Sequence, residues 1–139
     1  MRLEYIEANG IKSSDTGWRI TSREANPPEE REIVVEDLPF RKNPLYFPGL
    51  GRWYSRRELS YEFDQSFQHA AAAVRGADTF MAWIGSIDLT NMKDSLGDCT
   101  FTNVRCTSLS ASYSGNVATV KVEFVADPYK IGSDGSESL

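Results

Sequence analysis

The chain has 139 residues, the length of a single domain with its own core, and 40% of them are hydrophobic. Charged residues make up 25% and the formal net charge is −5, a composition that excludes a disordered chain and does not fit a general nucleic-acid binder, whose binding domain is strongly basic. Apolar runs reach only five residues, far below the ~20 that cross a bilayer, so we expect no membrane insertion.

The first part of the chain predicts short strands of a sheet. Residues 2–6 alternate between polar and apolar side chains and lead into Asn9-Gly10, a pair typical of hairpin turns. A second candidate strand spans residues 18–21. The segment 31–36 is rich in β-branched side chains, which favour a third strand. The first ten residues lack the basic start and apolar stretch of a secretory signal, so we expect the chain to begin in a cytoplasm.

The segment 37–54 is the least regular part of the sequence. It contains three prolines and two glycines and shows neither helical nor alternating periodicity. We therefore expect a loop of roughly eighteen residues, a length that is usually functional or disordered. Its aromatic side chains argue against disorder.

Positive charge is concentrated in and just after this loop. Residues 38–57 hold five bases and no acid in an otherwise acidic chain. Arginine, tyrosine and tryptophan are enriched at interface hot spots, so we predict a contact surface between protein subunits. The alternative is a solvated loop whose aromatic rings pack into their own core. The predicted contact residues are Arg41, Lys42, Tyr46, Phe47, Arg52, Trp53, Tyr54, Arg56 and Arg57.

The clearest strand begins at Arg57, where apolar and polar side chains alternate through Asp64. Its apolar face carries Leu59, Tyr61 and Phe63, which we predict to be core. Two further strands, 100–113 and 117–125, are joined by the turn sequence Ser114-Gly115-Asn116 and form a closing hairpin. In the second of these strands the predicted core residues are Val120, Val122 and Phe124.

One helix is predicted at about 65–76. Four consecutive alanines favour it, Asp64 or Ser66 can accept hydrogen bonds from its first N–H groups, and Gly76 fits its end. The expected apolar stripe consists of Phe67, Ala70, Ala71 and Val74.

The remaining segments complete a single antiparallel domain. Residues 79–84 predict another strand, and 86–97 an irregular polar connection. We expect a mostly β or α+β domain at 1–131, an antiparallel sandwich or split barrel of about seven to eight strands with the helix packed at one side. Residues 132–139 are small and polar and predict a disordered tail.

No arrangement of residues predicts catalysis. The only histidine, His69, lies beside the alanine run without a nucleophile motif, and we interpret it as structural. Cys99 and Cys106 form no metal motif and are predicted to be reduced thiols. The aspartates at 88, 94 and 98 lack the spacing of a calcium loop. We therefore predict no enzymatic activity, no metal and no cofactor.

Two non-catalytic functions remain open. The aromatic and basic loop could stack on sugars or bases and hold phosphates, as in a small binding module. Alternatively, a basic loop on an acidic protein provides two unlike surfaces, and such surfaces make head-to-tail contacts that close into rings or propagate as filaments.

Several short motifs resemble a known family. They are Glu36-Asp-Leu-Pro39, the run Tyr54–Phe63, the closing hairpin that ends at Ala126-Asp-Pro-Tyr129, and, earlier, Asn9-Gly10-Ile11 and Gly17-Trp18. Together with the helix they are similar to the amino-terminal, ring-forming domain of distal tail proteins of long-tailed bacteriophages with non-contractile tails. The resemblance covers about residues 1–131.

The resemblance implies a β-rich fold related to tail-tube proteins and a ring of six copies around a channel. It implies a virion protein, assembled in the host cytoplasm, that joins the tail tube to tail-tip or baseplate hub proteins, with DNA only passing through the channel. It implies no enzymatic activity and no cofactor. A tail-tube protein or a head–tail connector is the alternative. In either ring we expect the acidic surfaces to line the channel.

Overall fold

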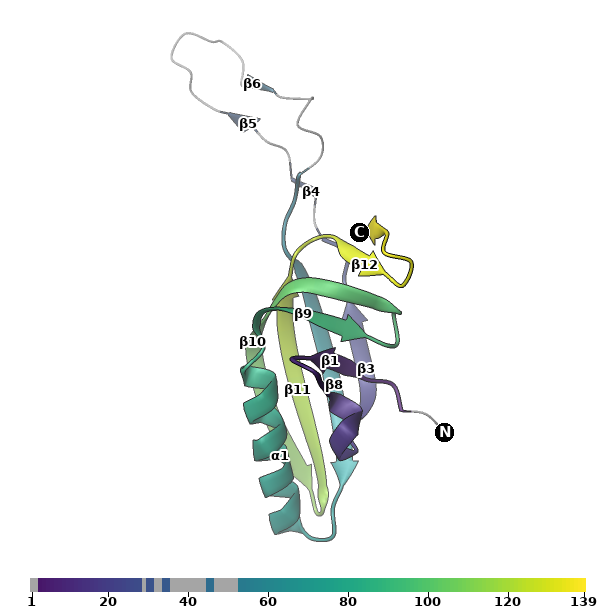
Figure 1. Ribbon diagram of the computed structural model, residues 1–139. Coiled ribbons are helices and arrows are strands. Elements are labelled where there is room, and N and C mark those ends of the chain that lie inside the picture. Colours follow the sequence, from purple (N-terminus) through teal and green to yellow (C-terminus); the bar gives the residue numbers. More distant parts are fainter. Residues whose placement is uncertain (1–2, 29, 32–33, 36–44, 47–52) are drawn as a thin grey trace.

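Among the residues that the structure describes, antiparallel pairing connects nine strands into one open sheet, with a single α-helix on one of its faces (Figure 1). The computed structural model describes residues 3–28, 30–31, 34–35, 45–46 and 53–139. The prediction of a mostly β, antiparallel fold with one helix packed at one side is confirmed. The strands of the sheet are β1 (Ile6–Ala8), β2 (Ile11–Lys12), β3 (Arg19–Ala25), β8 (Arg57–Ser66), β9 (Asp88–Asp94), β10 (Cys99–Ser114), β11 (Val117–Ala126), β12 (Lys130–Gly132) and β13 (Glu137–Ser138).

The sheet follows the order β2-β1-β9-β10-β11-β8-β3. Strand β10 is long enough to connect two parts of it, because its first residues pair with β9 and its last residues pair with β11. At the start of the chain, Asn9 and Gly10 have φ values of 56° and 77°, the left-handed conformation that a two-residue hairpin turn requires. The predicted turn between β1 and β2 is therefore confirmed. A short 3-10 helix, η1 (Ser13–Thr16), follows β2.

The core lies between the sheet and the helix, as the alternation in two strands predicts. Leu59, Tyr61 and Phe63 of β8 are at most 1% exposed, and so are Val120, Val122 and Phe124 of β11. Residue for residue, these two sets lie opposite one another across the sheet. Trp18, which precedes β3, stacks on Phe80 of the helix with ring centroids 4.4 Å apart.

The helix differs from the predicted 65–76 because α1 spans Ala70–Gly85. Neither Asp64 nor Ser66 caps its start. Instead, His69 is the N-cap, and its Nδ1 accepts a hydrogen bond from the backbone N–H of Ala72 at 3.1 Å. The imidazole thus has the structural role that we expected.

Gly76, predicted as the helix end, lies inside α1. A Cβ atom there would come within 2.4 Å of Cε1 of Phe67, so glycine makes room for this ring. The predicted strand 79–84 is therefore the second half of the helix, because a short apolar run does not distinguish a strand from a buried helical segment. Val74 of the predicted stripe is 42% exposed. The buried stripe instead consists of Ala73, Ala77, Phe80 and Ile84.

Two other segments contain strands where the sequence predicted irregular or disordered chain. The connection 86–97 contains β9, whose regular alternation is interrupted where Leu89 has a φ of 51°. Near the C-terminus, Ile131 of β12 pairs with Glu137 of β13, and β12 itself pairs with β10. Residues 130–138 thus include a short hairpin where we expected a disordered tail. The division of the chain at residue 131 stays a prediction.

The described residues of the segment 30–54 form four short strands. Strand β4 (Glu30–Arg31) pairs with β7 (Trp53–Tyr54), and β5 (Val34–Val35) pairs with β6 (Leu45–Tyr46), both antiparallel. We call these two pairs the arm. The predicted loop therefore carries strand pairs in its described residues. Figure 1 draws β5 and β6 beyond the end of the main sheet, away from the helix and the core.

Candidate subunit interface

The predicted contact residues are divided between the arm and the strand that follows it. Tyr46 lies in β6, and Trp53 and Tyr54 lie in β7. The other members of the arm region, Arg41, Lys42, Phe47 and Arg52, lie outside the described residues. Arg56 lies between the arm and β8, and Arg57 is the first residue of β8. The contact role of this set stays a prediction.

The base of the arm presents an aromatic pair and an arginine on the surface. Tyr54 meets Tyr129 edge to face, with centroids 6.0 Å apart and an interplanar angle of 81°, and Tyr129 is 43% exposed. The exposed Arg56 donates from Nη2 to the carbonyl oxygen of Asn103 at 3.3 Å. Asn103 in turn donates from Nδ2 to Asp127 at 2.6 Å. This surface combines the side chains that interface hot spots favour.

Arg57 occupies a different environment from its neighbour Arg56. It is 3% exposed, and its guanidinium lies over the Phe101 ring, 5.1 Å from the centroid. It donates to the carbonyl oxygens of Asn26 at 3.2 Å and Pro128 at 3.5 Å. Burial lowers the pKa of this guanidinium. Because these contacts lie within its own subunit, the placement argues against a contact role, and we treat Arg57 as a residue of the fold.

A buried polar cluster lies at the same end of the sheet. Asp94 is 0% exposed, and its Oδ2 accepts from Arg23 Nε at 2.7 Å and from the Tyr61 hydroxyl at 2.5 Å. Burial, together with the charge of Asp94, raises the pKa of Tyr61 strongly. The cluster joins β3, β8 and β9. Sequence reasoning considered Asp94 only as a cation ligand and missed this role, which depends on strands distant in the chain.

The structure also shows the surroundings of the aspartates and cysteines that the sequence analysis considered as possible ligands or reactive groups. Asp88 forms an ion pair with Arg105 at 3.5 Å. Within the described ranges, no group of three or more histidines, cysteines or acids is arranged to hold a metal ion. Cys99 and Cys106 are both free thiols, as predicted, and burial raises the pKa of each. No helix among the described residues has the length and hydropathy needed to cross a membrane.

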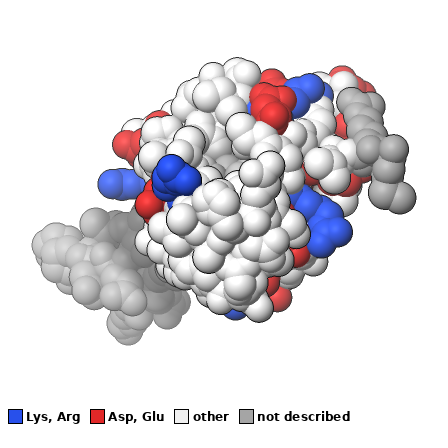
Figure 2. Space-filling model, turned by 90° about the horizontal axis from the view of Figure 1, so that it is seen from below, with Lys and Arg blue, Asp and Glu red and all other residues white. Residues whose placement is uncertain are grey.

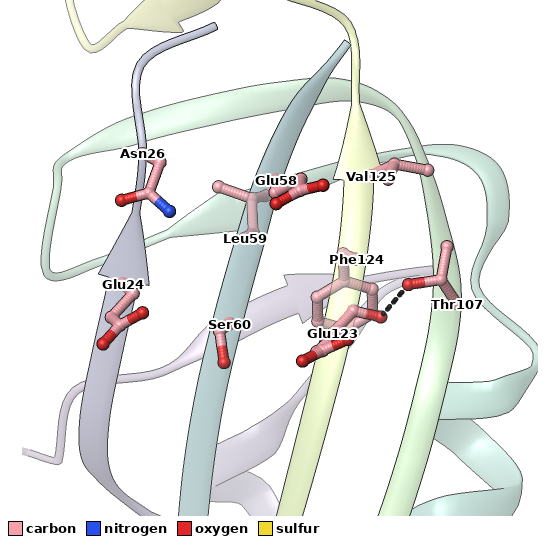
Figure 3. Close-up of a pocket in the computed structure, with 9 residues that line it drawn as sticks. All are labelled: Glu24, Asn26, Glu58, Leu59, Ser60, Thr107, Glu123, Phe124 and Val125. Atoms are coloured by element: carbon pink, nitrogen blue, oxygen red, sulfur yellow. Dashed lines mark hydrogen bonds between the residues drawn. The ribbon is translucent and has the colours of Figure 1, made fainter.

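An acidic surface covers the face of the sheet opposite to the core. Figure 3 shows Glu24, Glu58 and Glu123 around a hollow of about 180 Å³, where the Thr107 hydroxyl donates to the backbone oxygen of Glu123 at 3.2 Å. Strand alternation brings further polar side chains to this face. We call it the acidic face; its acids are Glu24, Glu58, Glu62, Asp64, Asp88 and Glu123, and its bases are Arg19, Arg105 and Lys121. The excess of carboxylates makes it repel polyanions.

Two edges of the sheet border the acidic face. Strand β3 ends the strand order on one side. On the other side, β10 uses one edge to pair with β11 as far as Ser114. Its opposite edge pairs with β9 up to Arg105, and Cys106 N donates to Ile87 O at 3.3 Å. The edge that follows, at residues 107–114, borders the acidic face. In the described part of the chain, no strand pairs with the outer edge of β3 or with that of residues 107–114. Such edges offer unpaired backbone groups to another chain.

Comparison with solved structures shows what fold this is. The chain superposes on the SPP1 Dit protein (gp 19.1), which its crystal structure describes as a paradigm of the hub adsorption apparatus in phages that infect Gram-positive bacteria. The TM-score is 0.67 at 12% sequence identity, over 94% of this chain and 53% of that one, so this chain spans about half the length of the SPP1 protein. No protein-family model matches the sequence. No curated protein matches it either. The resemblance to phage distal tail proteins that the sequence motifs implied is thereby confirmed at the level of the fold.

Proposed function

We propose that this protein is a structural component of a phage tail, and that its copies close into a ring at the distal end of the tail, between the tail tube and the tail tip or baseplate. The observation that carries the proposal is the fold shared with the SPP1 Dit protein over 94% of this chain. That protein is described as part of a hub adsorption apparatus.

The two free sheet edges supply a way to close a ring. Strands β3, β8, β11 and β10 alternate in direction, so β3 of one copy can pair antiparallel with residues 107–114 of the next. This contact is head-to-tail, because one edge of each copy meets the other edge of its neighbour. Backbone hydrogen bonds between strands would then hold the ring together. Six copies is the number that the family resemblance implies.

Pairing of these edges determines which face of the sheet lines the channel of the ring and which face is turned outward. The sheets become continuous, with the helices on one side and the acidic face on the other. We assign the acidic face to the channel, because a wall of carboxylates does not bind the DNA that passes along it. The helix side then faces outward.

The arm adds a second contact. In Figure 1, β5 and β6 lie beyond the end of the sheet, where a neighbouring subunit or ring can reach them. At the base of the arm, the exposed Arg56 would meet the acidic surface of a neighbouring copy. Complementary charges of this kind fix register and suppress wrong pairings.

Sedimentation velocity and negative-stain images of the purified protein test this function. We expect closed rings in equilibrium with monomer at high protein concentration. Long tubes in place of single rings would identify a tail-tube protein instead. Monomer at every concentration, alone and with the tail-tube protein of the same phage, would overturn the proposal.

The variant Arg56→Glu tests the contact at the base of the arm. Arg56 is exposed, so the variant monomer should stay folded while its assembly into rings is impaired. The matched control is Arg75→Glu on the exposed surface of α1, which makes the same charge change and should assemble like the wild type. Equal assembly of the two variants would contradict a role for Arg56.

A further inference from the structure

An apolar pocket opens between α1 and η1, which lie in front of the same face of the sheet (Figure 1). It has a volume of about 370 Å³. Its apolar walls are Ile11, Trp18, Phe67, Phe80 and Trp83. Unlike the hollow of the acidic face, this pocket is lined mainly by aromatic rings, as binding sites for small groups usually are.

The aromatic rings form the pocket by packing on one another. Trp18, which stacks on Phe80, also meets Phe67 edge to face with centroids 5.8 Å apart, and the rings of Phe80 and Trp83 lie 5.6 Å apart. Phe67 and Trp83 are half-buried, and Ile11 is 46% exposed. Apolar surface at the mouth of the pocket is therefore in contact with water, and covering it is favourable.

Two polar atoms of the lining residues have no hydrogen-bond partner. Among the described residues, nothing bonds to Nε1 of Trp83 or to Oε1 of Gln65, and both atoms are shielded from water. A buried donor or acceptor that stays unpaired costs free energy, and most such groups in folded proteins are paired. The pocket thus combines apolar walls with one unused donor and one unused acceptor.

Charge is scarce around this pocket. Lys12 is the charged residue of its lining, and its Nζ lies over the Tyr5 ring, 4.7 Å from the centroid. Residues 65–74, which lead from β8 into α1, contain no lysine, arginine, aspartate or glutamate. Figure 2 looks onto the end at which α1 begins; the middle of this view is white, and charged side chains lie around it. A charged occupant would lose water without meeting a free opposite charge, so the pocket suits a neutral one.

We propose that the pocket binds the side chain of a tyrosine from another protein of the tail. The phenol ring supplies a flat apolar body for the aromatic walls. Its hydroxyl both donates and accepts, so one group can accept from Trp83 Nε1 and donate to Gln65 Oε1. The partial charges of the hydroxyl are thereby complementary to those of the pocket. Because both side chains are only half-buried, a small rotation turns their polar atoms toward the hydroxyl.

The partner lies outside the ring. In the proposed ring the helix side faces outward, so neighbouring copies leave the pocket open. That the partner is a tail protein rests on the proposed function, whereas the binding of tyrosine does not, because one copy contains the whole pocket. Its volume is close to the lower limit of about 300 Å³ for ligand sites, which suits a single ring.

NMR of the indole N–H groups tests the site on the full chain. The chain has three tryptophans, and Trp83→Phe identifies the signal of Trp83. We expect N-acetyl-L-tyrosinamide to shift this signal downfield until the site is saturated. N-acetyl-L-phenylalaninamide, which lacks only the hydroxyl, should bind about tenfold more weakly. Equal binding of the two probes, or no saturable shift with either, overturns the proposal.

Two further results would identify a different occupant. If p-cresol binds and N-acetyl-L-tyrosinamide does not, the pocket takes a free phenol and not a side chain. If the Trp83 signal shifts when the protein is concentrated without a probe, the occupant belongs to a second copy. Either result overturns the proposal. None of these measurements depends on ring assembly, so this proposal and the proposed function can fail independently.

Substitutions at the pocket locate the bound ring. Thr79 is exposed and lines the pocket, so Thr79→Phe should fill the mouth and abolish binding. The matched control is Val74→Phe, which adds the same ring at an exposed position of α1 outside the pocket and should bind like the wild type. Gln65→Met removes the acceptor, so the preference for the tyrosine probe should fall from about tenfold to about threefold.

Circular dichroism checks that each variant is folded. The proposal is overturned if Thr79→Phe binds the tyrosine probe as tightly as Val74→Phe. It is equally overturned if Gln65→Met keeps the full preference for the tyrosine probe, because the hydroxyl then lies elsewhere.

Discussion

At the scale of single residues, two adjacent arginines lie in opposite environments. Arg56 is exposed, whereas Arg57 is buried between two carbonyl oxygens and the Phe101 ring. We predict that Arg57→Glu lowers the free energy of unfolding by about 3 kcal/mol, because it leaves a buried carboxylate facing carbonyl oxygens. Urea denaturation followed by circular dichroism measures the difference.

The same substitution one residue earlier is the control. Arg56→Glu should change the free energy of unfolding by less than about 0.5 kcal/mol, as is usual for an exposed site. If the two variants are equally stable, the contacts of Arg57 do not support the fold.

The Tyr61 hydroxyl gives stability that depends on pH. Its pKa is raised above the ordinary 10.0 by burial and by Asp94. Below pH ~10 the phenol is neutral in both states and the stabilisation is complete. As pH rises further, the unfolded chain releases this proton and the folded chain keeps it, so the free energy of unfolding falls. Tyr61→Phe should remove this decline and cost about 2 kcal/mol at neutral pH, because a hydrogen bond to a charged group is lost.

Tyr113→Phe provides the comparison for Tyr61→Phe. Tyr113 is 43% exposed, so its removal should leave both the stability and the alkaline decline unchanged. Denaturation profiles between pH 7 and 11 distinguish the two variants. An unaltered alkaline decline in Tyr61→Phe would contradict the role of the buried phenol.

At the scale of elements, two glycines of α1 have opposite expected effects. Gly76→Ala places a Cβ 2.4 Å from Cε1 of Phe67 and should lower the free energy of unfolding by about 2 kcal/mol through overpacking. At Gly85 the nearest atom, Leu109 Cδ2, is 4.0 Å away. Gly85→Ala should therefore raise stability by about 0.5 kcal/mol through its helix propensity. Thermal denaturation compares them; a stabilising Gly76→Ala would show that Phe67 moves aside freely.

The alternation of apolar and polar residues correctly predicted the strands that have one buried and one polar face. Strands β8 and β11 have one buried and one polar face, so their alternation identified both the strands and their core residues. The sequence placed the end of α1 too early because glycine is typical of a helix end. In the structure Gly76 lies inside the helix, where the absence of a Cβ makes room for the ring of Phe67. That contact joins residues that only the folded helix brings together.

The candidate interface was predictable only in part, because local composition shows which residue types are present and not which of them are buried. Composition identified the basic and aromatic segment and its exposed Arg56. It could not separate Arg56 from Arg57, because burial of Arg57 depends on Asn26 and Pro128, which are distant in sequence. The free edges of β3 and β10 follow from strand order, which no local pattern contains.

At the scale of the whole molecule, the proposed ring makes a topological prediction about DNA. Carboxylates on the channel wall should prevent binding, so wild-type rings should bind no duplex. Glu58→Lys with Glu123→Gln should give rings that bind DNA in a salt-dependent manner. If the acidic face lines the channel, rings of this variant that have been cross-linked shut bind linear duplex, which can thread through the ring, and not a closed circle. Fluorescence anisotropy with linear and circular duplexes of equal length measures both.

A control outside the channel completes this test. Asp78→Lys with Ala82→Lys makes the same change in net charge on the exposed surface of α1, which the proposed ring turns outward. Any DNA that this variant binds should be bound equally well in linear and circular form, because no threading is involved. If the Glu58 and Glu123 variant also binds circles as well as linear duplex, the acidic face lies outside the ring, and the helix must occupy the inner wall.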